Sequence, residues 1–494
     1  VASITLYDYI QWKGESSAAS SQKDIQRYWQ YNALDTSYTA RIDLYYLSNL
    51  PAYARKNYSD AFPLIYPCLY CAFEGILIDQ EVRERHKVTY EAAMAKRLAS
   101  LRTMTADPLF NPSSPKQVAE YVYELFGAAD PHIGKSNKGG KKVRTTKGTN
   151  EKNLTAVGSQ HPLLLRLTDN IIGYREDRKA VSTYFTFLQK RGRLLYSINP
   201  FGTESGRASC SASSFWCGTQ VQNIPSYAKS MLISDPGFEL FEGDKSQSEA
   251  RCTAYMSQDT KLIEALEDKD KDFYKVLAFL FFQIPYEEVT LYMRNKIIKK
   301  ICHGTNYVMG AQTFIDNAGT QNLITAASVL GIEITMSKYI KPGQQTLKQF
   351  AGNLLETYNV PFPRVRERYA EVKAEIAGTK MLVSPMGHVR YFFGDIMKDH
   401  NMQRSAIAHG PQNLSVSILN KGFWNIWCLV KEYPRDIRLK AQIHDSVFGQ
   451  VRIGRPDLKQ KIEAAMEYSV QIHGRTMTIP NDFKYGTAWK EEES

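Results

Sequence analysis

The sequence predicts an α+β fold, in which long helical regions are set apart from a strand-rich region. In several stretches before residue 190, and again over 276–380, apolar residues recur at the three- and four-residue steps of a helix. From about residue 194 the segments become shorter and strand-like, with Gly, Ser and Asn turns between them. Helices and strands that occupy different parts of the chain are typical of α+β proteins.

Composition and charge narrow the class of protein. The 494 residues, 43% apolar and 23% charged, are enough for several folded domains. Lys and Arg exceed Asp and Glu by 62 − 51 = 11, which favours a polyanionic partner. No apolar run approaches the roughly 20 residues that span a bilayer, so we expect no membrane association.

The cysteines indicate a reducing compartment. Seven are scattered along the chain, an odd number, so we expect a protein of a reducing compartment. Cys68 and Cys71 have no second ligand pair nearby, which favours packing over zinc binding. The chain begins at Val1, as a processed or truncated product would.

The N-terminal 200 residues are predicted to be mainly helical. A helix over 24–47 carries Tyr31 and Asp35 four residues apart on one face, where a simple side-chain pair is the plainer interpretation. Ser114 before a proline predicts a capped helix start. The segment 134–152 is rich in Lys, Arg and Gly without periodicity, which predicts a loop suited to a phosphate backbone. Helix returns over 161–190.

An acidic residue follows the strand predicted over 238–242. We expect this strand to end at Gly243 and a helix to begin near Ser246, with Ser246 and Glu249 forming a capping box. Asp244, between strand and helix, then presents its carboxylate and a neighbouring backbone carbonyl to solvent. Such hard oxygen ligands suit Mg²⁺.

A second acid is predicted in the turn of a hairpin. Residues 437–454 alternate apolar and polar side chains, break at His444 and Asp445, and resume, as two antiparallel strands would. If Asp445 meets Asp244 on one sheet, the pair can hold two metal ions roughly 3.5–4 Å apart. Asp is also common in turns because its side chain bonds the backbone. A helical segment is expected after this hairpin.

The stretch 293–310 predicts an amphipathic helix with a cationic face. Met293, Ile297 and Ile301 fall on one side of it. The polar side carries Lys296, Lys299, Lys300, His303 and Tyr307. Lysines can clamp a triphosphate and an aromatic ring can stack on a base, although a polar face alone is ordinary for a helix.

Six stretches, in the right order, resemble motifs of family A DNA polymerases, the DNA polymerase I type. These are 244–251 and 442–445 (palm motifs), 299–310 (nucleotide-binding finger helix), 203–209 with 222–225 (thumb-to-palm segment), Arg404 with Gln412 (helix before the hairpin) and 31–35 (last motif of the proofreading exonuclease). The resemblance covers about 60–490. It implies a right-hand polymerase, with an antiparallel palm sheet, helical fingers and a helical thumb, preceded by an exonuclease-domain remnant.

The same resemblance implies boundaries and partners. Residues 1–60 are the exonuclease remnant, 61–200 the thumb, 201–275 and 385–494 the palm, and 276–384 the fingers. The implied reaction adds dNTPs to the 3′-hydroxyl of primer–template DNA in replication or repair. It uses two Mg²⁺, for which Mn²⁺ can substitute. We expect a monomer that works with replication accessory proteins. The resemblance also implies a cytoplasmic location in a bacterium or phage-infected host, with an organellar origin still open.

Single-residue roles also come from the resemblance. Asp244 and Asp445, with the carbonyl of Lys245, hold the metals, and Lys299 joins the two acids as a catalytic residue. The dNTP-binding set is Gln247, Glu249, Tyr274, Arg294, Lys299, His303 and Tyr307. The DNA-binding set is Arg207, Asn223, Arg404, Gln412, His444, Lys141, Lys142 and Arg144. Glu249 is expected to block a ribose 2′-hydroxyl.

Several positions depart from the family pattern. Ser446 stands where the family has an acid after His-Asp, and this departure with 303–307 is more typical of phage members. The family's finger-helix Arg falls at Asn295, so we expect a π-bulge that returns Arg294 to the triphosphate, or else Lys296 or Lys300 in its place. The Gly that follows the finger Tyr is replaced by Val308.

Three alternatives stay open. An RNA polymerase or reverse transcriptase would use the same acids, and Glu249 argues for deoxyribose selection. A non-catalytic subunit that binds primer–template DNA would tolerate Ser446. A nuclease of this type would need a longer fold with further paired acids before Tyr31, which is absent from this sequence, so we expect no proofreading from it.

Overall fold

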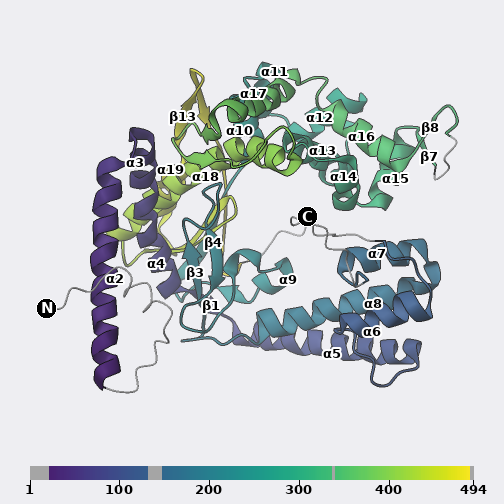
Figure 1. Cartoon of the computed structure of the whole chain (residues 1–494), viewed down its shortest axis with the longest axis horizontal. Helices are drawn as coiled ribbons and strands as arrows, with labels where there is room; N and C mark the ends of the chain where they lie inside the picture. Colours follow the sequence, from purple (N-terminus) through teal and green to yellow (C-terminus); the bar gives the residue numbers. More distant parts are fainter. Residues whose placement is uncertain (1–21, 132–146, 336–339, 490–494) are drawn as a thin grey trace.

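The computed structural model describes residues 22–131, 147–335 and 340–489. Two helical arms extend to the same side from a strand-rich body, and a long helix runs along the opposite side of that body (Figure 1). Most of the basic segment predicted over 134–152, including Lys141, Lys142 and Arg144, lies outside the described residues.

A four-stranded antiparallel sheet forms the centre of the body, in the order β11-β12-β6-β15. Its strands are β6 (Phe238–Lys245), β11 (Ile437–Ile443), β12 (Ser446–Arg452) and β15 (Asn481–Gly486). Strands β11 and β12 are the predicted hairpin, with His444 and Asp445 in its turn. In the register of the sheet, Asp244 of β6 stands opposite Ser446 on one side and Asp482 on the other.

Long helices bury the apolar side chains of this sheet. Helix α18 (His400–Glu432) begins after Asp399, whose carboxylate accepts bonds from the backbone amides of Asn401 and Met402. It packs with α19 (Pro456–Met466), and α4 (Ile65–Glu74) packs against β11. Phe241, Phe423 and Phe448 lie together in the resulting core.

The upper arm is the helical region predicted over 276–380. Its elements are α11 (Thr260–Glu267), α12 (Phe273–Phe282), η5 (Tyr286–Glu288), η6 (Met293–Ile298), α13 (Lys299–Asn306), α14 (Ala311–Ala318), α15 (Thr320–Val329), β7 (Glu333–Ile334), β8 (Gln344–Gln345), α16 (Leu347–Thr357) and α17 (Pro363–Thr379). Met293, Ile297 and Ile301 are buried in the core of this arm, as the helical period predicts. The η6 stretch is π-helical, which confirms the predicted bulge.

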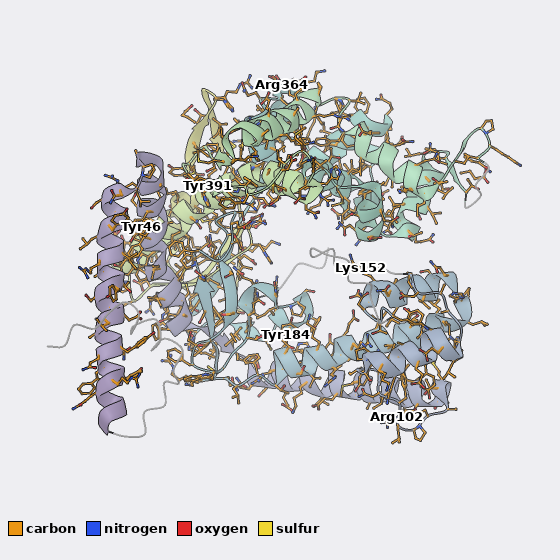
Figure 2. All side chains as sticks on the ribbon, viewed as in Figure 1. Tyr46, Arg102, Lys152, Tyr184, Arg364 and Tyr391 are labelled. Atoms are coloured by element: carbon orange, nitrogen blue, oxygen red, sulfur yellow. The ribbon has the colours of Figure 1, made fainter. Side chains whose placement is uncertain are left out.

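The lower arm has its own small core. Its elements are α5 (Gln80–Thr105), α6 (Pro115–Ala119), η2 (Glu120–Leu125), α7 (Glu151–Gln160), α8 (Pro162–Lys179) and η3 (Ala180–Phe185). Leu101, Phe110 and Ile171 are fully buried within it. The Ser114 hydroxyl caps α6, as predicted. Figure 2 shows Lys152 on the side of this arm that faces the upper arm.

The remaining elements connect the arms or lie at the body's edges. They are α2 (Gln22–Asn49), α3 (Ala52–Ala61), η1 (Phe62–Leu64), β1 (Ile76–Ile78), β2 (Arg193–Leu194), β3 (Tyr196–Asn199), β4 (Ser209–Ala212), η4 (Val221–Asn223), α9 (Ser226–Lys229), β5 (Leu232–Ile233), α10 (Ser248–Ser257), β9 (Met381–Val383), β10 (Val389–Tyr391), β13 (Ser469–Ile472) and β14 (Arg475–Thr478). Helix α2 confirms the predicted N-terminal helix and exposes most of its surface, Tyr46 included (Figure 2).

Two further predictions concern the packing of Cys68 and Cys71 and the lack of a membrane-spanning segment. Cys68 and Cys71 are buried and unbridged, in agreement with a packing role. None of the helices in the described part of the chain has the length and apolar character that a membrane crossing requires.

Two predictions about local structure are wrong. Strand β6 continues to Lys245, because Asn481 of β15 pairs with that residue and extends the strand. Helix α10 therefore begins at Ser248, and no side chain caps it. The predicted capping box is absent because the Ser246 hydroxyl bonds the Asp482 carboxylate instead.

The C-terminal region was predicted to be helical after the hairpin, and this is also wrong beyond α19. Strands β13, β14 and β15 follow that helix. Tertiary pairing explains the difference, since β15 is short and polar and becomes a strand by adding to the exposed edge of β6.

Candidate functional site

The two acids predicted to form a pair come from adjacent strands of the central sheet. Asp244 is exposed near the end of β6, and Asp445 is half-buried in the β11–β12 turn. The backbone amide of Lys245 donates to the carbonyl oxygen of Asp445 over 3.1 Å, so the main chain ties the two positions together. Two residues 445 − 244 = 201 positions apart are thereby held on one edge of the sheet.

Negative charge gathers around Asp244. The pKa of its carboxyl is raised to about 6, by burial first and then by the carboxylates of Asp445, Glu242 and Asp482. The ammonium of Lys299 acts in the opposite direction, which places this finger-helix cation within electrostatic reach of the acid. Because the effect of the three neighbouring carboxylates outweighs that of Lys299, the surroundings of Asp244 favour the binding of a further positive charge.

The donor set fits Mg²⁺ bound together with a phosphate substrate. Carboxylates and backbone carbonyls are the hard oxygen ligands that this ion prefers. Within the described residues, no three His, Cys, Asp or Glu side chains converge closely enough to hold an ion by themselves. Mg²⁺ commonly takes one or two carboxylates and completes its shell with water and substrate phosphates, which matches a two-acid site.

Lys245 contributes through its backbone rather than its side chain. The side chain is 2% exposed, and its ammonium donates to the carbonyl oxygen of Met466 over 2.6 Å. Burial lowers the pKa of this ammonium to about 8. The side chain is therefore committed to the body's interior, which leaves the main chain as the part of Lys245 available to a ligand.

A chain of polar contacts links the acids to the upper arm. Arg207 pairs with Glu249 of α10 and lies 3.6 Å from the carboxylate of Asp445. The hydroxyl of Tyr307, at the end of α13, donates to the other oxygen of Glu249. Burial raises the pKa of Glu249, and Arg207 opposes this shift. The structure thus brings four predicted site residues together.

The cationic face of η6 and α13 lines a pocket of about 800 Å³. Six residues of this face contribute to the lining: Arg294, Asn295, Lys296, Lys299, Lys300 and His303. Lys299 and Lys300 are exposed, while burial and these two lysines lower the pKa of His303. A cavity lined on one side by several cations suits a polyphosphate.

Arg294 reaches this pocket because of the π-helical turn in η6. Its guanidinium pairs with the carboxylate of Asp272 over 2.8 Å and lies 5.2 Å above the ring of Tyr274. Tyr274 is only 3% exposed, with the ammonium of Lys299 6.0 Å from its ring centre. The ring of Tyr274 therefore lies close to two cations, Arg294 and Lys299, while Lys296 and Lys300 line the same pocket without a contact to this ring.

The other predicted DNA contacts are spread over the body. His444 is exposed in the hairpin turn, with φ of +50°, and Gln412 is half-buried on α18. Arg404 is exposed near the start of α18, where it bonds Asn401. Asn223 lies at the end of η4 and bonds Gln220. Gln247 lies beside the acids, and its side-chain oxygen is buried without a partner among the described residues.

Three residues near the acids were missed by sequence reasoning. Glu242 lies two residues before Asp244 on β6, so the alternation of a strand predicts that both face one side. Asp482 stands opposite Asp244, but it belongs to the unpredicted β15. Trp489 bonds Glu242 from the segment after β15, and nothing in the local sequence indicates that contact.

The chain is similar in sequence to a known family of proteins. Residues 81–491 match the model of DNA polymerase family A. DNA polymerase I of Bacillus subtilis is 24% identical over 433 residues, which are 84% of this chain and 43% of that protein. The thermostable DNA polymerase I of Thermus aquaticus is 31% identical over 213 residues, 41% of this chain and 23% of that protein.

A solved structure supports the fold. The POL domain of Pol1 from M. smegmatis, in a complex with DNA primer-template and dNTP, matches with a TM-score of 0.70 at 19% identity. That match covers 87% of this chain and 70% of the other. The chain spans less than half the length of the curated relatives it matches, 43% of the Bacillus subtilis protein for example.

Proposed function

This chain belongs to DNA polymerase family A, and from that premise we propose that it is a template-directed DNA polymerase that extends a primer with dNTPs. One observation carries the proposal: the tied pair Asp244 and Asp445 lies within electrostatic reach of Lys299, which lines the cationic pocket. Two acids for metal ions and a cation for a triphosphate are what nucleotidyl transfer needs.

Each residue of the pair has a proposed role. Asp244, Asp445 and the carbonyl of Lys245 would hold two Mg²⁺, which would activate the primer hydroxyl and stabilise the charge on the leaving group. The primer 3′-oxygen bonds the α-phosphorus of the dNTP, the bond between the α- and β-phosphates breaks, and pyrophosphate leaves. Lys299 neutralises the triphosphate and donates a proton to pyrophosphate.

The pocket residues bind the incoming nucleotide. Arg294 and His303 contact the triphosphate, with Tyr274 beneath Arg294. Glu249 excludes a ribose 2′-hydroxyl, and its bond from Tyr307 fixes the position of its carboxylate. Tyr307 lies at the template side of the new base pair, and Gln247 completes the dNTP-binding set.

The DNA is gripped by the body and both arms. Arg207 and Gln412 donate to minor-groove acceptors that A·T and G·C pairs share, so they test pairing without reading sequence. Asn223, Arg404 and His444 contact the strands nearby. We assign 61–200 as thumb, 201–275 and 385–494 as palm, and 276–384 as fingers, after a remnant of an exonuclease domain over 1–60.

The test is primer extension with a labelled primer–template, dNTPs and Mg²⁺. Asp445→Ala should lower the extension rate by about three orders of magnitude, since losing a ligand of the reacting centre costs several kcal/mol. Asp436→Ala is the matched control, because Asp436 lies at the far end of the same hairpin and pairs with Arg452 and Arg455. Equal extension by parent and Asp445→Ala contradicts the assignment.

Ser446 favours a second candidate, a non-catalytic subunit that binds primer–template DNA. In that case the parent protein binds the labelled duplex tightly and incorporates no dNTP with either Mg²⁺ or Mn²⁺. The same reactions therefore separate the two functions.

A further inference from the structure

Glu242 lies on β6 close to Asp244 and Asp445, and both of its carboxylate oxygens accept hydrogen bonds. One carboxylate oxygen accepts a bond from the Ser446 hydroxyl over 3.2 Å, and the other accepts from the indole N–H of Trp489 over 3.0 Å. The Ser446 hydroxyl also lies 2.9 Å from the carbonyl oxygen of Ile443, the last residue of β11. The single hydrogen of this hydroxyl is shared between the two acceptors, and through it Glu242 contacts both ends of the turn that carries Asp445.

Trp489 is a rigid anchor for this contact. Its side chain is 3% exposed, and its ring lies 4.7 Å from that of Phe448 on β12. The ammonium of Lys229, the last residue of α9, lies 4.6 Å from the centre of the same ring. The backbone amide of Trp489 donates to the carbonyl oxygen of Leu232 over 2.8 Å. The indole therefore holds Glu242 from a fixed position.

These contacts argue against metal binding by Glu242 itself. Both of its oxygens already accept a bond from a neutral donor, and a metal would have to displace one of them. The described residues also hold no cluster of three acids close enough to chelate an ion. Glu242 therefore reaches the acid pair in two ways without binding a metal: its charge repels that of Asp244, and one of its oxygens accepts a bond from Ser446.

We propose that Glu242, Ser446 and Trp489 form a brace that positions the Asp445 turn against β6, which makes Glu242 a positioning residue for the proposed polymerase reaction. The inference rests on the proposed function for its catalytic meaning. It also gives Ser446 a reason: a hydroxyl at that position can donate to Glu242, whereas the acid typical of the family would be repelled by it. The two residues are then one coupled feature.

The experiment compares Glu242→Gln, Glu242→Ala and Ser446→Ala with the parent protein. Glutamine can keep both bonds, because its oxygen accepts from Trp489 while its amide donates to Ser446, which still donates to Ile443. Alanine removes both. Glu239→Gln is the matched control, since Glu239 lies on the same strand and pairs with Lys459.

Two readouts are needed. The first is the Kd of Mn²⁺ for the protein–primer–template complex, followed by the paramagnetic resonance of free Mn²⁺. The second is the split between kcat and the KM for dNTP in single-nucleotide incorporation. Glu242→Ala should raise the Mn²⁺ Kd and lower kcat by about 5- to 30-fold each, the effect of one or two lost hydrogen bonds, with KM changed less than about twofold.

Glu242→Gln should stay within about threefold of the parent in both readouts. If Glu242→Gln fails as badly as Glu242→Ala, the charge itself is required and the brace is wrong. The brace is equally wrong if Glu242→Ala matches the Glu239→Gln control.

A third measurement separates the brace from the proposed function. If the parent incorporates no nucleotide, the polymerase assignment fails on its own. The double variant Glu242→Ala with Ser446→Ala, compared with both single variants by denaturant unfolding, then decides whether the two residues are coupled. Additive effects of the two substitutions overturn the brace whatever the activity.

Discussion

Removing the charge of Asp244, the acid proposed to bind metal, should make the metal-free protein more stable. The pKa of this carboxyl is raised from 3.8 to about 6 by burial and by the neighbouring carboxylates, so its charge is unfavourable in the folded state. Asp244→Asn keeps the shape of the side chain and removes the charge. The expected result is a protein that unfolds at higher denaturant concentration but no longer extends primers.

The magnitude and the pH range follow from that shift. A difference of about 2 pKa units corresponds to about 3 kcal/mol. Asp244 keeps a solvent-accessible surface although protein atoms crowd its carboxyl, so solvent screening reduces this to about 1 kcal/mol. Since the folded-state pKa is the higher one, the penalty is absent below pH 4, grows between pH 4 and 6, and is complete above pH 6.

Urea unfolding in EDTA at pH 5 and pH 7.5 tests the reasoning. The gain from Asp244→Asn should be larger at pH 7.5, and added Mg²⁺ should reduce it by stabilising the parent alone. Asp235→Asn is the control and should instead destabilise the protein. Asp235 pairs with Arg193 and Arg438, and its pKa is lowered, so its charge is favourable in the folded state. If Asp244→Asn is destabilising at pH 7.5, the proposed charge repulsion is refuted.

Three further predictions concern other parts of the molecule. Glu249→Ala should raise incorporation of ribonucleotides relative to dNTPs at least about tenfold in single-nucleotide assays, and an unchanged ratio removes its role in sugar selection. Arg294→Ala should raise the KM for dNTP by about tenfold or more while the exposed Lys296→Ala changes it little, and the reverse order would give Lys296 the triphosphate. Lys440→Ala should destabilise the protein by about 3 kcal/mol in urea, because it leaves the Glu74 carboxylate without its buried partner; a loss below about 1 kcal/mol contradicts this.

Features set by local periodicity were predictable from the sequence. The alternation of 437–454 gave the hairpin and placed Asp445 in its turn, and the three- and four-residue steps identified the buried face that begins at Met293. The extra residue near Arg294 suggested a bulge as one of two options, and η6 is π-helical there. In each case neighbouring residues alone determine the outcome.

Features set by distant pairing were not predictable. Asn481 extends β6 by pairing with Lys245, and this displaces the start of α10 that the local Ser-x-x-Glu pattern indicated. The contact of Trp489 with Glu242 joins segments far apart in sequence. Where the partner of a strand or side chain lies hundreds of residues away, periodicity and capping rules carry no information about it.

The position of β6 in the sheet also affects how the protein is made. Its two partners, β12 and β15, begin about 200 and 240 residues after it. At a translation rate of 5–20 residues per second, the ribosome needs about 10–50 s after completing β6 to deliver β15. During that time the strand bearing Asp244 lacks both neighbours, so Asp244 and Asp445 are not yet side by side and the unpaired edges are open to chaperones or to aggregation.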